Sequence, residues 1–108
     1  MKEVERRASV RYPLDLKANY RLVRRNEVVA TGEGQTVNIS SGGILLRPDN
    51  RLLDNEEITL SIAWPATLNG GARLQLCLTG RVVRADDTHA AVRCLDYVFR
   101  TARKSMSM

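Results

Sequence analysis

The sequence predicts an all-β protein, a six-stranded antiparallel β-barrel, on the strength of three observations. Its patterned segments alternate apolar and polar residues with a period of two, which is the period of a half-buried strand. Short turn signals separate these segments, and no stretch before residue 95 keeps a helical period over three turns. The chain has 108 residues, of which 44% are hydrophobic and 27% are charged, as in a single folded domain.

The strands are predicted one by one from this alternation. In the first, residues 14–22, Leu14, Leu16, Ala18, Tyr20 and Leu22 share one face. Gly80 lies inside a long segment and predicts a bulge or bend there. We expect a hairpin about Asp86-Asp87 to join the last two strands. The remaining predicted strands are 35–39, 43–47, 58–64, 74–84 and 88–95.

The two ends of the chain are predicted to lie outside the barrel, which we expect to span residues 14–96. Residues 1–13 are polar and basic and end at Tyr12-Pro13, so we expect a flexible segment that orders when a ligand binds. Residues 97–108 are expected to form a short C-terminal helix and tail, with Val98, Phe99 and Ala102 packed against the barrel.

The positive charge is concentrated at the N-terminus. Residues 1–25 hold eight basic and three acidic side chains and so carry the whole net charge of +5, whereas the later residues balance. Fourteen of the basic residues are Arg, whose planar donor fork suits phosphate and guanine. This favours an anion or nucleotide site, and the alternative is a solvated tail.

Composition also predicts where the protein resides. No apolar run is long enough to span a bilayer, and the N-terminus does not resemble a secretory signal. We therefore expect a cytoplasmic location without membrane insertion, in which Cys77 and Cys94 stay reduced as buried structural thiols.

Signals of catalysis are weak, so the prediction is a protein that is not an enzyme. His89 is the single histidine, and no nucleophile elbow or phosphate-binding glycine loop is present. The carboxylate pairs Glu56-Glu57 and Asp86-Asp87 fall at turn positions, where solvation is the simpler role. We expect no metal and no cofactor, because zinc needs about four protein ligands.

Two motifs do stand out, and together they resemble the signature of a known family. Arg6-Arg7-Ala8-Ser9-Val10-Arg11 contains R-x-x-x-R, and Asn38-Ile39-Ser40-Ser41-Gly42-Gly43 reads N-x-S-x-x-G. In this order they resemble the PilZ domain family, a split-type β-barrel that binds the bacterial second messenger cyclic di-GMP. Residues 80–84 and 91–95 are similar to two strands of that family, so the resemblance covers residues 6–96.

The resemblance implies a role for each motif residue. Arg7 and Arg11 would hold guanine edges and phosphate, since one Arg can meet guanine with two hydrogen bonds. Asn38 would meet a guanine edge, Ser40 would add a hydroxyl, and Gly43 would allow close approach or positive φ. Arg6 would stack on a guanine face and favour a paired ligand, or it is simply solvated.

The function implied is a cyclic di-GMP receptor that signals to a partner protein when residues 1–13 become ordered. One alternative is a barrel of the oligonucleotide-binding type that binds single-stranded nucleic acid. That class uses aromatic stacking platforms, whereas aromatic residues make up only 5% of this chain, so nucleic acid is disfavoured. The other alternative is a PilZ-type adaptor that has lost ligand binding.

Overall fold

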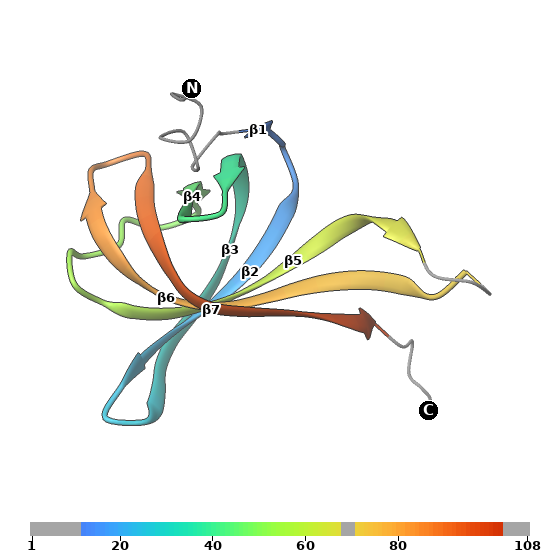
Figure 1. Ribbon diagram of the computed structural model, residues 1–108. Helices are drawn as coiled ribbons and strands as arrows, with labels where there is room; N and C mark the ends of the chain where they lie inside the picture. Colours follow the sequence, from blue (N-terminus) through green and yellow to red (C-terminus); the bar gives the residue numbers. More distant parts are fainter. Residues whose placement is uncertain (1–11, 68–70, 103–108) are drawn as a thin grey trace, which may run out of the picture.

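The computed structural model describes residues 12–67 and 71–102, and their regular secondary structure is entirely β-strand (Figure 1). The all-β prediction is therefore confirmed for this part of the chain, where no helix is long and apolar enough to cross a membrane. The strands are β1 (Tyr12–Pro13), β2 (Lys17–Arg24), β3 (Glu27–Ser40), β4 (Gly43–Pro48), β5 (Glu57–Thr67), β6 (Arg73–Ala85) and β7 (Ala90–Ala102).

The six longer strands are hydrogen-bonded in a closed cycle. Their order is β3-β2-β5-β6-β7-β4, and β4 also pairs with β3, which returns the sheet to its first strand. Every one of these pairings is antiparallel, as predicted. The short β1 pairs with β3 beyond the end of β2. Closure leaves few free strand edges, which removes most sites of unwanted pairing.

The core fills the inside of this closed sheet. Alternate residues of β2, β5 and β6 point inward, so the period-two pattern of the sequence becomes burial in the structure. Ile58, Ile62 and Leu46 are completely buried, and Tyr20 is 3% exposed. The predicted strand over residues 14–22 begins later, at Lys17, and Leu14 and Leu16 are only half-buried.

β3 is much longer than the five residues predicted for it. It begins at Glu27, directly after a tight turn in which Arg25 and Asn26 have φ values of 55° and 65°. Such left-handed residues match the twist of a two-residue hairpin. Residues 27–31 are exposed on both faces, so no alternation of apolar and polar residues marks this half of the strand.

The predicted C-terminal helix is wrong. Residues 97–102 continue β7, where Tyr97 pairs with Leu78 and Phe99 with Leu76. Tyr, Val and Phe are weak helix formers and fit a pleated surface well. The available edge of β6 therefore decides the structure of this segment. Residues 103–108 lie outside the described residues.

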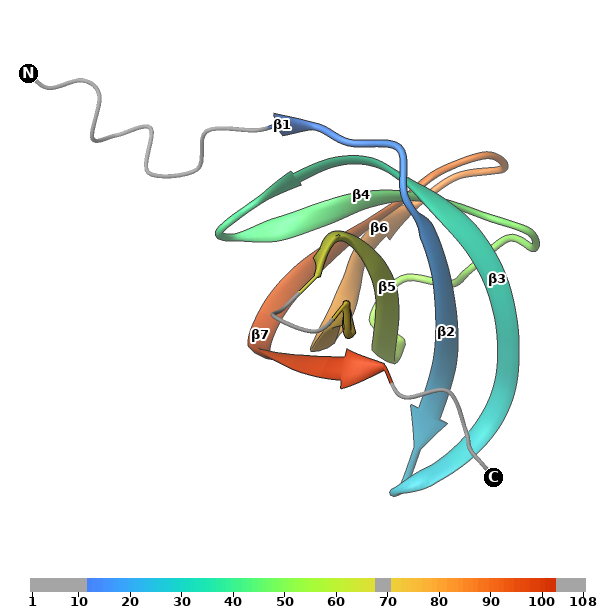
Figure 2. The ribbon, with the colours of Figure 1, turned by 90° about the vertical axis from the view of Figure 1, so that its right-hand side faces the viewer.

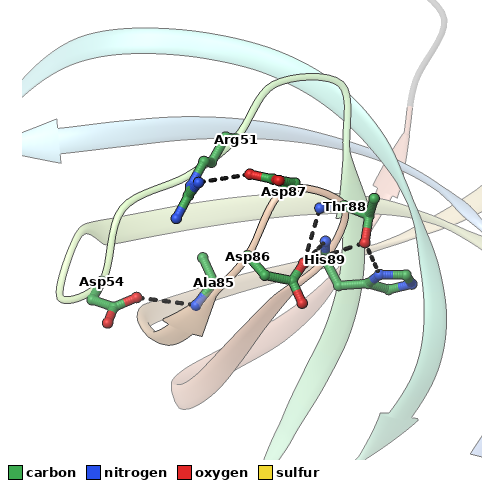
Figure 3. Close-up of polar contacts among 7 residues, drawn as sticks. All are labelled: Arg51, Asp54, Ala85, Asp86, Asp87, Thr88 and His89. Carbon is green, nitrogen blue, oxygen red and sulfur yellow. Dashed lines mark hydrogen bonds and ion pairs between the residues drawn. The ribbon is translucent and has the colours of Figure 1, made fainter.

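A loop between β4 and β5 covers one end of the closed sheet. Leu52 from this loop is 2% exposed and packs into the core. Figure 3 shows two contacts that fix the loop to the β6–β7 hairpin: an ion pair of 2.6 Å between Arg51 and Asp87, and the Asp54 carboxylate accepting from the Ala85 amide. Asp86 organises the predicted hairpin turn by accepting from the Thr88 and His89 amides, which lowers the pKa of Asp86.

The start of the same loop is tied to β2 and β3 through a phenol and a carboxylate. Tyr20 Oη donates to Asp49 Oδ1 at 2.7 Å, and Asp49 Oδ2 accepts from the Glu33 amide. Burial, followed by the contact with Asp49, raises the pKa of Tyr20 to about 12. The hydrogen bond from Tyr20 is the main cause that lowers the pKa of Asp49. Gly32 leaves the space that the phenol occupies, because a Cβ there would lie 2.3 Å from Tyr20 Oη.

Candidate functional site

The second predicted motif forms the hairpin between β3 and β4. Asn38 and Ser40 lie at the end of β3, Gly43 begins β4, and Ser40 pairs with Gly43 across the turn. Arg6, Arg7 and Arg11, the arginines of the first motif, lie outside the described residues. The described part of the site is therefore this hairpin and the strands that flank it.

A bulge in β3 determines which way Asn38 faces. The β3–β4 register shifts between Thr36 and Asn38, so Val37 is an extra residue in the ladder. Without it, Asn38 would share the inward face of Thr36, which is 1% exposed. With it, Asn38 pairs with Leu45 and shares the outer face with Ser40. The bulge thus brings the amide and the hydroxyl of the motif to the same side of the sheet.

Ser40 shapes the turn with its own side chain. Its hydroxyl accepts from the Gly42 amide and donates to the Gly43 carbonyl, both at 3.3 Å. Hydrogen bonds of this length lie beyond the usual range and are weak. The Ser40 hydroxyl can therefore exchange these bonds for bonds to a ligand at little cost.

Gly43 is required by the protein's own backbone. A Cβ at this position would lie 2.2 Å from the Val92 carbonyl oxygen of β7. The φ of Gly43 is not positive, so the expected left-handed conformation is wrong. The expected close approach does occur, but the backbone that approaches Gly43 is that of β7. The amide of Cys94 also donates to the Gly42 carbonyl at 3.0 Å. The absence of a side chain at Gly43 consequently allows β4 and β7 to pair closely next to the hairpin, and we call this contact between the two strands the β4–β7 seam.

The chain that leads into β2 is fastened close to the same hairpin. Tyr12 pairs with Ile39 and Pro13 pairs with Asn38, so β1 runs beside the end of β3 (Figure 2). Residues 12 and 13 are thus the last of the segment predicted to be flexible, and they are paired. Arg11 is the residue immediately before Tyr12 in the sequence. The described chain directly after the first motif is therefore paired with the strand that carries the second motif.

Thr36 fixes the turn between β1 and β2. Its hydroxyl accepts from the Leu16 amide at 2.9 Å and donates to the Leu14 carbonyl. Its own amide donates to the Leu16 carbonyl at 2.9 Å. Thr36 is the buried polar residue of the described core, and all three bonds hold residues 14–16.

Sequence reasoning missed one basic residue at this site, Arg93. In the β4–β7 ladder Arg93 pairs with Gly43, so it lies across the glycine from Ser40 on the outer face. A cavity of about 430 Å³ lies here, with Ser40, Gly42, Gly43 and Arg93 in its lining. Arg93 is far from both motifs in sequence, and only the pairing of its strand with β4 could have indicated it.

A second arginine stands directly opposite Arg93. Arg81 of β6 pairs with Arg93, and like charges in directly opposed positions of a sheet repel each other. Arg81 Nη1 donates to the Asn55 carbonyl at 2.8 Å, which orients one guanidinium. Glu57 of β5 is the neighbour of Arg81 on its other side, so Arg93 is the basic residue of this row that lies next to the hairpin and is suited to an anion.

The two cysteines are free, and they are half-buried where buried thiols were predicted. Cys77 lies between the inward-facing Leu76 and Leu78 and so faces outward. Cys94 packs partly against the core, and burial raises the pKa of its thiol. Among the described residues, no three His, Cys, Asp or Glu side chains gather closely enough to hold a metal ion.

Comparisons with known proteins agree with this architecture. The PilZ domain family model matches residues 5–104, and the chain therefore belongs to the PilZ domain family. Among solved structures, it resembles the crystal structure of the PilZ domain of CeSA from a cellulose-synthesizing bacterium. The TM-score is 0.61 and the identity 18% over 82% of each chain, which establishes a shared fold. No curated protein matches the sequence.

Proposed function

We propose that this protein is a receptor for cyclic di-GMP, the ligand that PilZ domains generally bind. One observation carries the proposal: β1, which follows Arg11 in the chain, pairs with Ile39 and Asn38 of the second motif. A ligand lying on the β3–β4 hairpin is then within reach of both motifs. The ligand carries two guanines and two phosphates, which suits a site of guanidinium, amide and hydroxyl groups.

Each residue has a distinct role in the proposed complex. Arg7 and Arg11 bind guanine edges and phosphate with their paired donors. Asn38 accepts from a guanine edge, and Ser40 donates its hydroxyl in place of its weak bonds within the turn. Arg93 adds a charge on the far side of Gly43, where it neutralises part of the ligand's charge. Gly43 acts indirectly by keeping the seam between β4 and β7 closed.

The proposed signal is a change in the N-terminal segment. Residues 1–13 order over the hairpin when Arg7 and Arg11 capture the nucleotide, and the altered surface is recognised by a partner protein. The ligand is a charged dinucleotide that does not cross a bilayer unaided, so the protein acts in the cytoplasm. No catalytic step is involved.

Titration calorimetry with cyclic di-GMP tests the site. Wild type is expected to bind, and the Arg7→Ala/Arg11→Ala variant to lose at least about a hundredfold in affinity, because charge-assisted bonds contribute about 1.5–3 kcal/mol each. The matched control is Arg21→Ala/Arg84→Ala, which removes two exposed arginines elsewhere and is expected to bind as wild type does. Equal binding by both double variants would refute the site, and a wild type that does not bind would indicate the adaptor alternative.

The stoichiometry tests the role of Arg6. If its guanidinium stacks on a guanine face, wild type binds a self-stacked pair of ligands and Arg6→Leu shifts the ratio toward one per chain. A ratio of one for wild type that Arg6→Leu leaves unchanged would contradict the stacking role.

A further inference from the structure

The second half of β7 has a free edge. Up to Cys94 the strand lies between β6 and β4, but from Leu95 to Ala102 it pairs only with β6 among the described residues. Figure 1 shows this half extending away from the closed part of the sheet, alongside β6 and β5. Open edges of this kind expose a row of backbone donors and acceptors to any other strand.

Beyond a bulge at its start, this edge lacks the usual protection against pairing. Natural edge strands carry lysine, proline or bulges. Leu95 is a bulged residue where the free edge begins, whereas Asp96–Thr101 holds neither lysine nor proline and keeps a regular register with β6. Its apolar side chains are unusually accessible: Leu95 is 60% exposed, Tyr97 58%, Val98 47% and Phe99 45%. Exposed apolar residues gathered on one strand indicate a contact surface.

The sequence of the edge is complementary to itself. Asp96-Tyr97-Val98-Phe99-Arg100 is symmetric about Val98 in chemical character, with an acid at one end, a base at the other and an aromatic on each side of the centre. Two such strands placed antiparallel set Asp96 opposite Arg100 twice and Tyr97 opposite Phe99 twice. A two-fold axis requires this relation, in which residue i meets residue j and j meets i.

The faces of the strand agree with this pairing. Tyr97 and Phe99 pair with the inward Leu78 and Leu76, and the Phe99 ring lies 5.3 Å from that of Trp64. Asp96, Val98 and Arg100 are on the opposite face. In the part of the chain that the structure describes, neither Asp96 nor Arg100 forms an ion pair. Asp96 Oδ1 accepts from the neighbouring Tyr97 amide at 2.9 Å, but no opposite charge of the described chain neutralises Asp96 or Arg100, so both can form ion pairs with a second copy.

We propose that two copies of this protein dimerise through antiparallel pairing of their β7 edges, centred on Val98. The β5, β6 and β7 strands of both copies then form one continuous sheet, and the two closed ends lie at opposite ends of it. Aromatic pairs form on one face and Asp96–Arg100 pairs form on the other, each of which stabilises a strand pair.

Analytical ultracentrifugation of the full chain without ligand tests the dimer. Wild type is expected to show a monomer–dimer equilibrium, and Asp96→Arg or Arg100→Asp alone to weaken the dimer by about tenfold or more, since each places like charges opposite one another twice. The combined Asp96→Arg/Arg100→Asp variant restores opposite charges and is expected to recover the dimer. Arg84→Asp, a reversal away from this edge, is the control and should behave as wild type.

A crosslink tests the register. Val98→Cys is made in a Cys77→Ser background, because Cys77 is the cross-strand neighbour of Val98 within the chain. Mild oxidation should join two Val98→Cys chains by a disulfide, whereas Cys77→Ser alone should stay uncrosslinked. A monomeric wild type, or a dimer insensitive to both charge reversals, would overturn the proposal. Neither result bears on cyclic di-GMP binding, which the calorimetric titration measures separately.

Discussion

Thr36 shows how a single buried hydroxyl determines where a segment of chain leaves the core. Replacing it by Val keeps the shape but leaves the Leu16 amide and the Leu14 carbonyl without this partner. Unsatisfied buried groups cost about 1–3 kcal/mol, so Thr36→Val should lower the free energy of unfolding by that amount. Urea denaturation followed by Trp64 fluorescence measures it.

Two substitutions separate the hydroxyl from general effects at this site. Thr36→Ser keeps the donor and acceptor and should lose much less stability than Thr36→Val. Thr59→Val changes a half-buried outer-face threonine for which the structure gives no side-chain bond, and it should be nearly neutral. Equal losses for Thr36→Val and Thr36→Ser would show that the hydroxyl does not hold residues 14–16.

The Tyr20–Asp49 pair predicts how stability varies with pH at both extremes. The folded pKa of Tyr20 is raised, so its contribution is full below pH 10 and is lost as pH rises toward 12. The folded pKa of Asp49 is lowered, so its contribution is present above pH 3.8 and is lost as pH falls below it. Both ends of the pH range should therefore weaken the tie between the loop and β2.

Urea midpoints across pH test this pair. Tyr20→Phe should lower the free energy of unfolding by about 1 kcal/mol near neutral pH. The difference in this free energy between the variant and wild type should become smaller between pH 10 and 12. For Asp49→Asn, the difference in the free energy of unfolding from wild type should become smaller as the pH falls below 3.8 instead. Differences that stay constant over these ranges would contradict the pKa shifts.

At the scale of single residues, the sequence was informative where a motif was local. Asn38, Ser40 and Gly43 are neighbours in the chain, and their hairpin was predicted from turn residues and flanking strands. The bulge at Val37 could not be predicted, because alternation around it is weak on both sides. Arg93 owes its place to the pairing of β7 with β4, which no local pattern encodes.

At the scale of elements, two adjacent glycines of one hairpin should differ sharply. A Cβ at Gly43 meets the Val92 carbonyl, whereas a Cβ at Gly42 meets nothing within 4 Å. Gly43→Ala should therefore destabilise by about 1–3 kcal/mol or more through a shifted β4–β7 seam. Gly42→Ala should stay within about 0.5 kcal/mol of wild type. Thermal unfolding of both variants decides the matter, and a neutral Gly43→Ala would indicate that the seam can open freely.

The strands themselves were predictable to the extent that they are half-buried. β2, β5 and β6 alternate because one face packs on the core, and their predicted ranges overlap the observed ones. A bulge or bend was predicted at Gly80, and the β6–β7 register does shift between Thr79 and Gly80, but the extra residue is Leu95 of the partner strand β7. Residues 27–31 of β3 and the end of β7 are exposed on both faces, so their periodicity is lost. At the end of β7, a helical spacing of apolar residues was misleading.

For the whole molecule, binding of the proposed ligand should raise the unfolding temperature. A ligand that binds only the folded state at a hundred times its Kd adds about 2.7 kcal/mol. In a domain of this size each kcal/mol corresponds to about 4–8 °C. Differential scanning fluorimetry with cyclic di-GMP should show such a rise for wild type and none for Arg7→Ala/Arg11→Ala. A similar rise with GMP at the same concentration would contradict recognition of the cyclic dinucleotide.

The antiparallel all-β architecture was the most predictable property of the whole molecule. Short turns, antiparallel hairpins and the bulge or bend expected at Gly80 all predicted a curved antiparallel sheet. The closure of this sheet depends on β4, which is inserted between β3 and β7 although its neighbours in sequence are β3 and β5. That placement requires contacts between residues far apart in the chain, and alternation gives no information about them.

The pairing of β1 with β3 has a consequence for how strongly the arginines of the N-terminal segment can bind the nucleotide. Arg7 is five residues before Tyr12, so the chain cannot carry it more than about 18 Å from that anchor. A nucleotide held first by the hairpin therefore meets tethered guanidinium groups at a high effective concentration. The same segment supplied as a separate peptide would have to be present at about millimolar concentration to act equally well.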